Sequence, residues 1–270
     1  MAAWDRDPIV IDPTIPSSAR MYDYYLGGKD NFASDREAAE KVLANFPAMR
    51  TTARENRAFL GRVIRYLAAE AGIRQFIDIG TGIPTANNTH QVAQRIDPDV
   101  RVIYVDNDPI VLTHARALLT TADGVVDYID ADLRDPGEIL SDKRMSALDF
   151  SQPIAVLLFA ILHFIPDQDQ PYAIVNQLID AVPPGSYLAL SHGTGDHLPP
   201  GQSETGSQIY TRAGIDLRIR GLGEVESFFD GLDLVDPGVV PVSAWRPDYP
   251  EIEPVPLAEA SLYGAVARKS

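Results

Sequence analysis

The periodicity of hydrophobic and polar residues changes once along the chain, near residue 75. In residues 49–71 apolar side chains recur at helical spacing, which predicts one long helix with a single buried face. From residue 75 onward, short apolar runs alternate with amphipathic stretches. We therefore expect an N-terminal arm and helical cap over residues 1–74, followed by an α/β domain over residues 75–270.

The apolar runs after residue 75 are short enough for strands, and the stretches between them are long enough for helices. Strands are expected at residues 75–79, 101–106, 125–130, 153–160 and 186–191. Helices are expected near residues 85–96, 108–121, 136–148 and 170–182. Apolar strands that alternate with helices imply a parallel sheet covered on both faces, and right-handed crossovers make it a doubly wound, Rossmann-like sheet.

The alternation stops after residue 191. Residues 192–208 carry glycine, proline and serine, and are expected to form a long loop. A helix is expected over residues 223–230, and two strands over residues 233–241 and 260–268. Strands so close in the sequence are expected to pair antiparallel, which gives the mostly parallel sheet an antiparallel C-terminal edge.

The N-terminal segment holds an unusual density of aromatic residues. After a proline-containing arm, Tyr22, Tyr24 and Tyr25 stand directly before a Gly27-Gly28 break, which predicts a short helix that ends at the glycines. This arrangement is typical of a lid over a ligand. A helix end that simply packs on the core is the competing interpretation.

Composition narrows the class of protein. The 270 residues are 45% hydrophobic, as in a globular chain, and include no cysteine, which excludes disulfides and thiolate metal sites. We expect no metal. The formal net charge of −15 disfavours DNA or RNA as a partner, because phosphate backbones are bound by clustered lysine and arginine. No apolar run approaches about 20 residues and no leader-like segment opens the chain, so we expect a cytoplasmic protein.

The first predicted strand runs into the glycine turn Asp78-Ile-Gly80-Thr-Gly82. Glycine lets a ligand approach the backbone and adopts positive φ, and a helix N-terminus behind the turn offers unpaired amides. Thr85 stands where the third glycine of a dinucleotide-binding turn would fall. An acid before the first glycine and no third glycine favour a ligand without a pyrophosphate, such as S-adenosyl-L-methionine (SAM).

Acidic residues also end the next two predicted strands, and in doubly wound folds the ligand lies beyond these ends. Asp106 follows the glycine turn at a spacing typical of an acid that accepts ribose hydroxyls. Asp108 precedes Pro109 and is expected to cap a helix instead. After the third strand, Asp130 and Asp132 compete for the adenine amino group, and Asp132 lies later in the turn.

His163 follows the fourth predicted strand, where a reacting group of the substrate would lie. An imidazole there can act as a general base or orient the substrate. The competing interpretation is that it packs beside the methionine portion of the cofactor.

The acids and glycines at Asp78, Gly80, Gly82, Asp106 and Asp132 resemble the motifs of class I SAM-dependent methyltransferases. More narrowly, the chain resembles a bacterial S-adenosyl methyltransferase family that was first catalogued as a domain of unknown function. The likeness extends over nearly the whole chain and is carried by three segments, residues 18–32, 76–89 and 104–109. The N-terminal segment is the more specific motif.

The resemblance implies a Rossmann-like enzyme that transfers a methyl group from SAM to a small-molecule acceptor, which the resemblance does not identify. Asp78 would take the ammonium of SAM, Asp106 its ribose and Asp132 its adenine. The full expected cofactor set is Asp78, Gly80, Thr81, Gly82, Asp106, Asn107, Asp132 and Leu133. The expected border of the acceptor pocket is His163, Tyr22, Tyr24 and Tyr25. Pro84, where many class I proteins have glycine, constrains the turn.

Three other functions compete with this expectation. A SAM- or nucleoside-binding regulator without turnover would keep the same residues but lack an acceptor pocket. An NAD-dependent enzyme is disfavoured by the missing third glycine. A nucleic-acid methyltransferase is disfavoured by the acidic charge and by the lack of an Asn-Pro-Pro-Tyr type motif after the fourth predicted strand.

Overall fold

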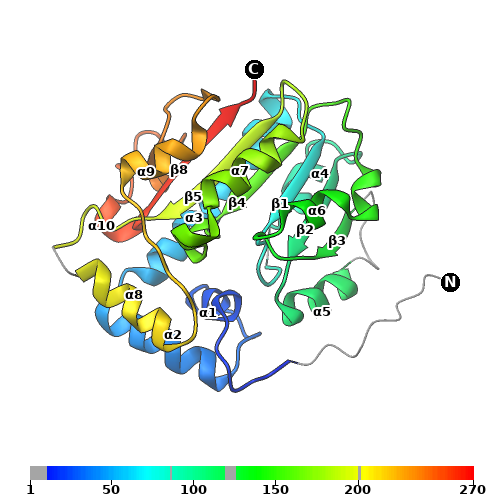
Figure 1. Cartoon of the computed structure of the whole chain (residues 1–270). Helices are drawn as coiled ribbons and strands as arrows, with labels where there is room; N and C mark the ends of the chain where they lie inside the picture. The colour runs from blue at the N-terminus through cyan, green and yellow to red at the C-terminus, as the bar shows by residue number, and fades with distance from the viewer. Residues whose placement is uncertain (1–10, 86, 119–125, 200–201) are drawn as a thin grey trace.

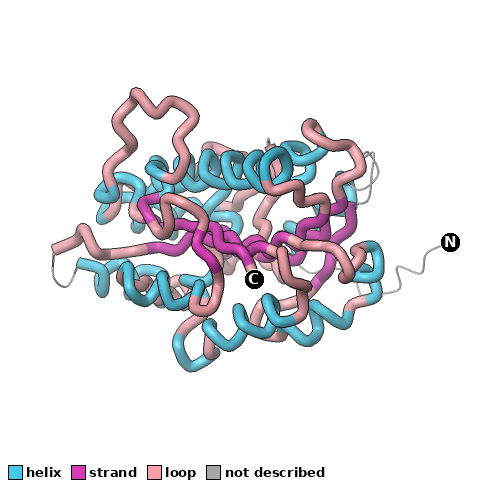
Figure 2. Tube along the Cα trace, turned by 90° about the horizontal axis from the view of Figure 1, so that it is seen from above, coloured by secondary structure: helices cyan, strands magenta, loops and turns pink. Residues whose placement is uncertain are grey.

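The computed structural model describes residues 11–85, 87–118, 126–199 and 202–270. One twisted sheet runs through the middle of the molecule, with helices on both of its faces (Figures 1 and 2). The alternation of apolar strands and amphipathic helices in the sequence therefore produces the expected three-layered α/β architecture.

Eight strands make up the sheet of the described residues, in the order β3-β2-β1-β4-β5-β8-β6, with β7 also paired to β8. Their bounds are β1 Gln75–Ile79, β2 Arg101–Asp106, β3 Val126–Asp130, β4 Ala155–Phe159, β5 Tyr187–Gly193, β6 Asp233–Leu234, β7 Val240–Pro241 and β8 Leu262–Arg268. The first five pair in parallel, and β8 runs antiparallel to β5. The expected mostly parallel sheet with an antiparallel C-terminal edge is confirmed.

Ten α-helices lie in the described residues. Their bounds are α1 Ser18–Tyr25, α2 Ala33–Asn45, α3 Met49–Arg65, α4 Thr89–Gln94, α5 Pro109–Leu118, α6 Pro136–Ser141, α7 Pro171–Asp180, α8 Gln202–Arg212, α9 Leu222–Glu226 and α10 Leu257–Ala260. A π-helical turn extends α3 to Glu70, close to the expected end of that helix. A 3₁₀ turn over Lys143–Ala147 follows α6 and fills the rest of the helix expected there.

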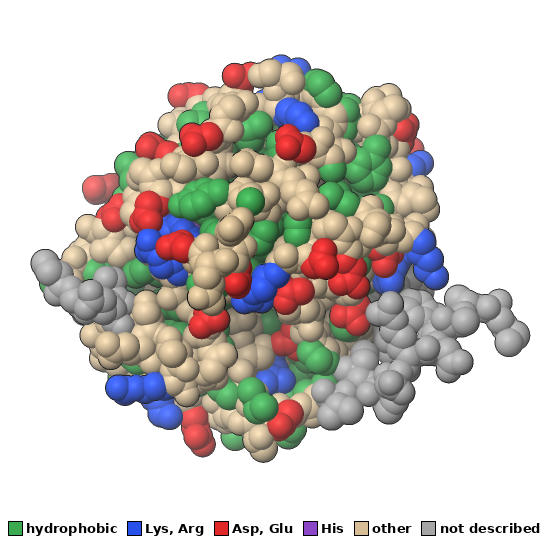
Figure 3. All heavy atoms as spheres, in the orientation of Figure 1, with side chains coloured by type: hydrophobic (Ala, Val, Ile, Leu, Met, Phe, Trp, Pro, Cys, Tyr) green, Lys and Arg blue, Asp and Glu red, His purple; other side chains and the backbone are tan. Residues whose placement is uncertain are grey.

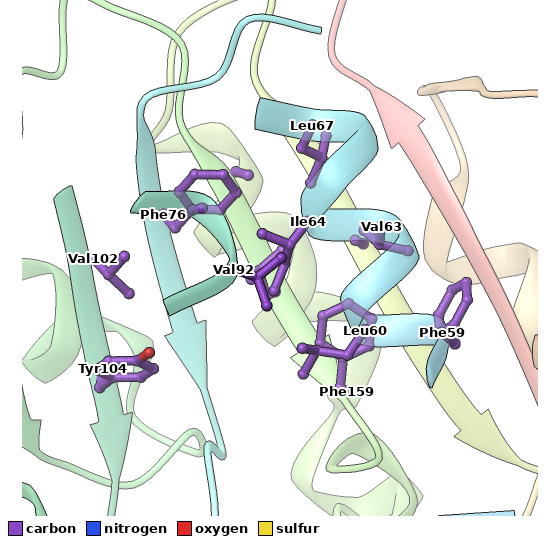
Figure 4. Close-up of a cluster of buried hydrophobic side chains, with 14 of the residues drawn as sticks. Phe59, Leu60, Val63, Ile64, Leu67, Phe76, Val92, Val102, Tyr104 and Phe159 are labelled. Atoms are coloured by element: carbon purple, nitrogen blue, oxygen red, sulfur yellow. The ribbon is translucent and has the colours of Figure 1, made fainter. Parts of the chain in front are cut away.

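Two hydrophobic clusters hold the layers together. On one face of the sheet, α3 contributes Phe59, Leu60, Val63, Ile64 and Leu67, which point at the side chains of β1, β2 and β4 (Figure 4). On the other face, the side chains of α6, α7 and α9 pack on the alternate residues of the same strands. Because α3 shares a core with the sheet, the last helix of the N-terminal segment is part of the central packing.

A third cluster lies at the carboxyl ends of the strands and joins α1 and α2 to α8. Tyr25 of α1 and Tyr210 of α8 are both buried there, with their hydroxyl oxygens 3.3 Å apart. In Figure 1, α1, α2 and α8 lie together below the ends of the strands. We call these three helices the cap.

One helix of the cap, α8, lies partly where the sequence predicted a loop. Residues 192–208 were expected to form a loop, but residues 202–208 belong to α8, and residues 200–201 lie outside the described part of the chain. The glycine, proline and serine content of the segment gave no helical signal. Packing of Tyr210 in the third cluster supplies the stabilisation that local propensity lacks.

Two further boundaries differ from the expectation. The strand expected over residues 233–241 is two short strands, because a turn over residues 235–238 separates β6 from β7. Helix α4 begins only at Thr89, because Asn88 and Gln91 form a capping box at its start. The other expected ends at residues 119–121 and 125 lie outside the described residues.

The surface carries charges of both signs. On the face shown in Figure 3, lysine and arginine side chains are scattered among aspartate and glutamate. Within the described ranges, no helix is both long enough and apolar enough to cross a membrane.

Candidate functional site

Two adjoining cavities lie at the carboxyl ends of the parallel strands, where a doubly wound sheet places its ligand. The first reaches under the cap, has a volume of about 360 Å³, and is called the cap cavity here. The second lies over the ends of β1, β2 and β3, has a volume of about 380 Å³, and is called the strand-end cavity. Both are lined by Ser18, Gly80, Asp106, Asn107, Ile161 and Phe164.

The glycine turn after β1 forms part of both linings. Gly80 has a φ of +72°, and a Cβ atom there would lie 2.6 Å from Cγ1 of Ile161. Gly82 has a φ of +65°, but a Cβ atom there would meet nothing within 4 Å. Both positions therefore need the conformational freedom of glycine, and only Gly80 also needs its small size. Thr81 lines the cap cavity, and its hydroxyl is hydrogen bonded to that of Tyr128.

Asp106 lies where the two cavities meet, at the end of β2. Its carboxylate accepts hydrogen bonds from the amides of Gly82 and Asp108, each over 2.9 Å. Burial raises the pKa of Asp106 to about 6, although these two hydrogen bonds act in the opposite direction. Asp108 caps α5 by accepting from the Ile110 amide over 2.9 Å, as the sequence predicts.

Asp78 is buried in the cap cavity, at the end of β1. It accepts a hydrogen bond of 2.5 Å from the Thr89 hydroxyl. Burial raises the pKa of Asp78 to about 6, against the effects of that hydrogen bond and of the positive charge of Arg57. Arg57 also lines the cap cavity and donates to the Asn87 carbonyl over 3.1 Å.

Arg57 is a site residue that the sequence did not single out. Its position within the long predicted helix indicated only one of several arginines on a solvated face. The signal lies in the fold, since α3 crosses the sheet and brings Arg57 near the carboxylate of Asp78.

The two candidate adenine ligands at the end of β3 lie differently with respect to the strand-end cavity. Asp132 and Leu133 line the strand-end cavity, whereas the lining does not include Asp130. Asp132 accepts from the side-chain amide of Asn107 over 2.9 Å and from the Arg134 amide over 2.8 Å. Asn107 thus bridges the turns that follow β2 and β3.

His163 is buried at the wall of the cap cavity, just after β4. Its Nδ1 accepts a 3.2 Å hydrogen bond from the Gly193 amide, so the neutral ring carries its proton on Nε2. Burial lowers the pKa of His163 to about 3, and the charge of Arg220 adds to this effect. The imidazole is therefore a neutral donor at physiological pH.

Of the three tyrosines expected at the acceptor pocket, the structure places two in the lining of the cap cavity. Tyr22 and Tyr25 line the cap cavity. Tyr24 does not, because its hydroxyl donates to Glu40 and its ring lies 4.9 Å from the guanidinium of Arg50. We therefore leave Tyr24 out of the candidate site.

The Gly27-Gly28 break after α1 has a structural role that involves Asp23. This buried carboxylate accepts from the Asp30 amide over 3.0 Å and from the Asn31 side chain over 2.7 Å. A Cβ atom at Gly28 would lie 1.9 Å from Asp23 Oδ1. The polar density of the N-terminal motif therefore organises a turn, and only some of its tyrosines reach the cavity.

The site offers carboxylates, amides and hydroxyls to an organic ligand. Among the described residues, no group of three or more histidine, aspartate or glutamate side chains is placed to hold a metal ion. The buried carboxylates at the ends of β1 and β2 suit an ammonium group and sugar hydroxyls, which fits the polar groups of SAM.

Comparison with known proteins agrees with this geometry. Residues 5–270 match the model of a family described as S-adenosyl methyltransferase. No curated protein matches the chain.

Solved structures also resemble this chain. The chain is 43% identical to a DUF574 family protein from Streptomyces avermitilis MA-4680, over 97% of this chain and 100% of that one, with a TM-score of 0.92. It is 39% identical to a putative methyltransferase from Thermobifida fusca YX, over 100% of both chains, with a TM-score of 0.87. A SAM-dependent methyltransferase from Anabaena variabilis ATCC 29413 shares the fold at 15% identity and a TM-score of 0.52.

Proposed function

Because the chain belongs to the S-adenosyl methyltransferase family, whose methyl donor is SAM, we propose that it methylates a small-molecule acceptor held in the cap cavity. One observation carries the proposal. The buried carboxylate of Asp106 lies at the junction of two cavities, one at the strand ends and one under the cap. An elongated ligand held at Asp106 by its ribose would extend into both.

The residues at the strand ends divide the cofactor between the two cavities. Asp132 and Leu133 would hold the adenine in the strand-end cavity, and Asp106 would accept from the ribose hydroxyls. Gly80, Thr81 and Gly82 would follow the amino-acid portion into the cap cavity. Asp78 would take its ammonium group there, since a buried carboxylate favours an opposite charge.

Arg57 completes this assignment. The amino-acid portion of SAM carries a carboxylate as well as an ammonium, and an arginine is the natural partner of a carboxylate. Arg57 acts electrostatically on Asp78, so the two side chains present opposite charges to one end of the cap cavity. We assign the carboxylate of SAM to Arg57.

The chemistry needs alignment more than a special catalyst. When bound, SAM would supply a methyl group whose carbon bonds in line to an acceptor atom as its bond to the positively charged sulfur breaks. His163 orients the acceptor in this proposal, because its Nδ1 is occupied and its low pKa makes it a poor base. The cap then excludes water from the reacting atoms.

Replacement of Asp106 tests the proposal. We expect Asp106→Ala to lower the affinity for S-adenosylhomocysteine, the demethylated product, by about 1–3 kcal/mol, because buried hydroxyls lose their acceptor. Asp99→Ala, a change of the same type at an exposed position outside both cavities, is the matched control and should bind as the wild type does. Equal affinity of both variants would remove the ribose assignment.

A further inference from the structure

Few of the residues that line the cap cavity are charged. Of all the described residues that line this cavity, only Arg57, Asp78 and Asp106 carry a formal charge. The proposed function assigns all three to SAM. The remaining lining therefore meets the acceptor without any charged side chain, which disfavours a phosphate, a carboxylate or an ammonium group in the acceptor, because a buried charge needs a partner.

The lining of the cap cavity is also rich in aromatic rings. Six of the lining residues are tyrosine or phenylalanine, namely Tyr22, Tyr25, Phe46, Phe159, Phe164 and Tyr210, and of these Phe164 also lines the strand-end cavity. They come from α1, α8, the end of β4, the residue after α2 and the 3₁₀ turn Leu162–Phe164. Aromatic walls favour flat apolar molecules, which they contact by stacked or edge-to-face packing.

The neutral polar groups in the lining are mostly engaged with the protein. Tyr22 donates to the Ala53 carbonyl over 3.1 Å and accepts from the Asn56 side chain over 3.0 Å. Asn56 in turn accepts from the Ser191 hydroxyl over 2.6 Å. These groups stabilise the junction between cap and sheet, and leave little hydrogen-bonding capacity for a ligand.

Two histidines of the lining are exceptions. Nδ1 of His197 is buried with no hydrogen-bond partner among the described residues. In His163, Nδ1 is occupied by the Gly193 amide and no described residue pairs with Nε2, so only His163 has its proton fixed on the unpaired nitrogen. The residue before Gly193, His192, is held by two contacts of its own. Gly193 also accepts through its carbonyl from Nδ1 of His192, over 2.8 Å, and Nε2 of His192 lies 3.0 Å from Nη1 of the buried Arg220. The Nε2–H of His163 is therefore a donor of fixed orientation in a largely aromatic lining, whose only charged residues among those described are the three assigned to SAM.

We propose that the acceptor is an uncharged, ring-containing molecule with one oxygen that accepts a hydrogen bond from Nε2 of His163. This inference rests on the proposed function, since it assigns the charged end of the cavity to SAM. It deepens that function by naming the class of acceptor.

Affinity for simple naphthalenes tests the inference with the protein saturated with S-adenosylhomocysteine. The probes are 2-naphthol, 2-methylnaphthalene and 2-naphthoate, which share one ring system and differ in a hydroxyl, a methyl and a carboxylate group. We expect 2-naphthol to bind about fivefold to tenfold more tightly than 2-methylnaphthalene, the effect of one neutral hydrogen bond. We expect 2-naphthoate to bind more weakly than either, by fluorescence titration.

Variants of His163 assign the effect to its ring. In His163→Leu the advantage of 2-naphthol over 2-methylnaphthalene should disappear, and His163→Gln, which keeps an N–H donor, should retain part of it. His114→Leu removes an imidazole from α5, outside both cavities, and should keep the full advantage.

The outcomes separate this inference from the proposed function. If the protein binds S-adenosylhomocysteine but binds 2-naphthoate more tightly than 2-naphthol, the proposed acceptor class is wrong. It is also wrong if His163→Leu still prefers 2-naphthol to 2-methylnaphthalene by the same factor as the wild type. Neither result would affect the proposed function. Failure of the folded wild type to bind S-adenosylhomocysteine would instead overturn the proposed function.

Discussion

The backbone amide of Gly82 donates a 2.9 Å hydrogen bond to the carboxylate of Asp106, and so ties the glycine turn after β1 to the end of β2. This hydrogen bond within the protein positions the turn and Asp106, the proposed partner of the ribose, relative to each other. The parallel pairing of β1 with β2, with Asp78 beside Tyr104, fixes the same relationship from the sheet side. A preorganised site of this kind loses less entropy when a ligand binds.

Alanine at the two glycines of the turn should give different results. Gly80→Ala adds a Cβ atom 2.6 Å from the Ile161 side chain and also strains a φ of +72°. Gly82→Ala strains a φ of +65° but meets no atom within 4 Å, so its cost should stay near the roughly 1 kcal/mol of a left-handed residue. We expect thermal unfolding to show the larger loss of stability for Gly80→Ala, and equal losses would contradict the packing argument.

The assignment of Arg57 predicts a ligand-dependent effect. Arg57→Gln should weaken binding of S-adenosylhomocysteine about tenfold, because a charge-assisted hydrogen bond to its carboxylate is lost. Binding of 5′-methylthioadenosine, which has no amino-acid portion, should change little. Calorimetric titration of both ligands makes the comparison, and a matched loss for the two ligands would mean that Arg57 acts only by holding the fold.

The two buried carboxylates predict how affinity depends on pH. The pKa values of Asp78 and Asp106 are both raised to about 6 by burial, so the groups are ionised at pH 7.5 and become protonated as the pH falls to 5. Only the ionised forms accept from hydroxyls and hold an ammonium. Affinity for S-adenosylhomocysteine should therefore fall by about tenfold per carboxylate between pH 7 and pH 5.

Asp106→Asn provides the control for this pH profile. It removes one of the two titrating groups, so the profile of the variant should be flatter than that of the wild type. An affinity that stays constant from pH 7.5 to 5 in the folded wild type would rule out both carboxylates as ligands.

The raised pKa of Asp78 also predicts how the stability of the ligand-free protein depends on pH. A carboxyl with a folded pKa near 6 and an unfolded value of 3.8 binds more protons in the folded state between these values, so its contribution to stability falls as the pH rises through that window. Asp78→Asn removes the buried charge and keeps an acceptor for Thr89. The ligand-free variant should unfold at a higher temperature than the wild type at pH 8, and at a similar temperature at pH 4.

A lower unfolding temperature for Asp78→Asn at pH 8 would show that the ionised form is needed for folding. We expect Asp78→Asn to raise the free energy of unfolding at pH 8 by on the order of 1–3 kcal/mol. The same variant should bind the ammonium group of the ligand more weakly.

The sheet could be predicted because its signals are local. The parallel strands are short, largely apolar runs, and β1 and β2 have the bounds that the pattern predicts. Asp106 and Asp132 follow from the rule that ligands bind beyond such strand ends. The preference for Asp132 over Asp130 agrees with the lining of the strand-end cavity.

The cap could not be predicted in the same way, because its signals are tertiary. Helix α8 follows a segment with breaker composition and is held by contacts such as Tyr210 with Tyr25, which are far apart in the sequence. Arg57 and Arg50 look alike in a helical pattern. Only the fold sends Arg57 to the cap cavity, while Arg50 lies over the ring of Tyr24.

The protonation of His163 was equally beyond the sequence. Its neighbours His192, Gly193 and Arg220 are brought together by the end of β5 and the segment before α9. The position of His163 after β4 in the sequence was compatible with three roles: a general base, a group that orients the substrate, or a packing residue. The Gly193 hydrogen bond and the burial of the ring favour the orienting role.

Calorimetric titration of the purified, ligand-free protein with SAM and with S-adenosylhomocysteine tests the central claim most directly. We predict one site per chain, with micromolar or tighter affinity for both ligands and none for NAD under the same conditions. An absence of binding to both ligands by folded protein would contradict the claim that the cavities joined at Asp106 hold the methyl donor.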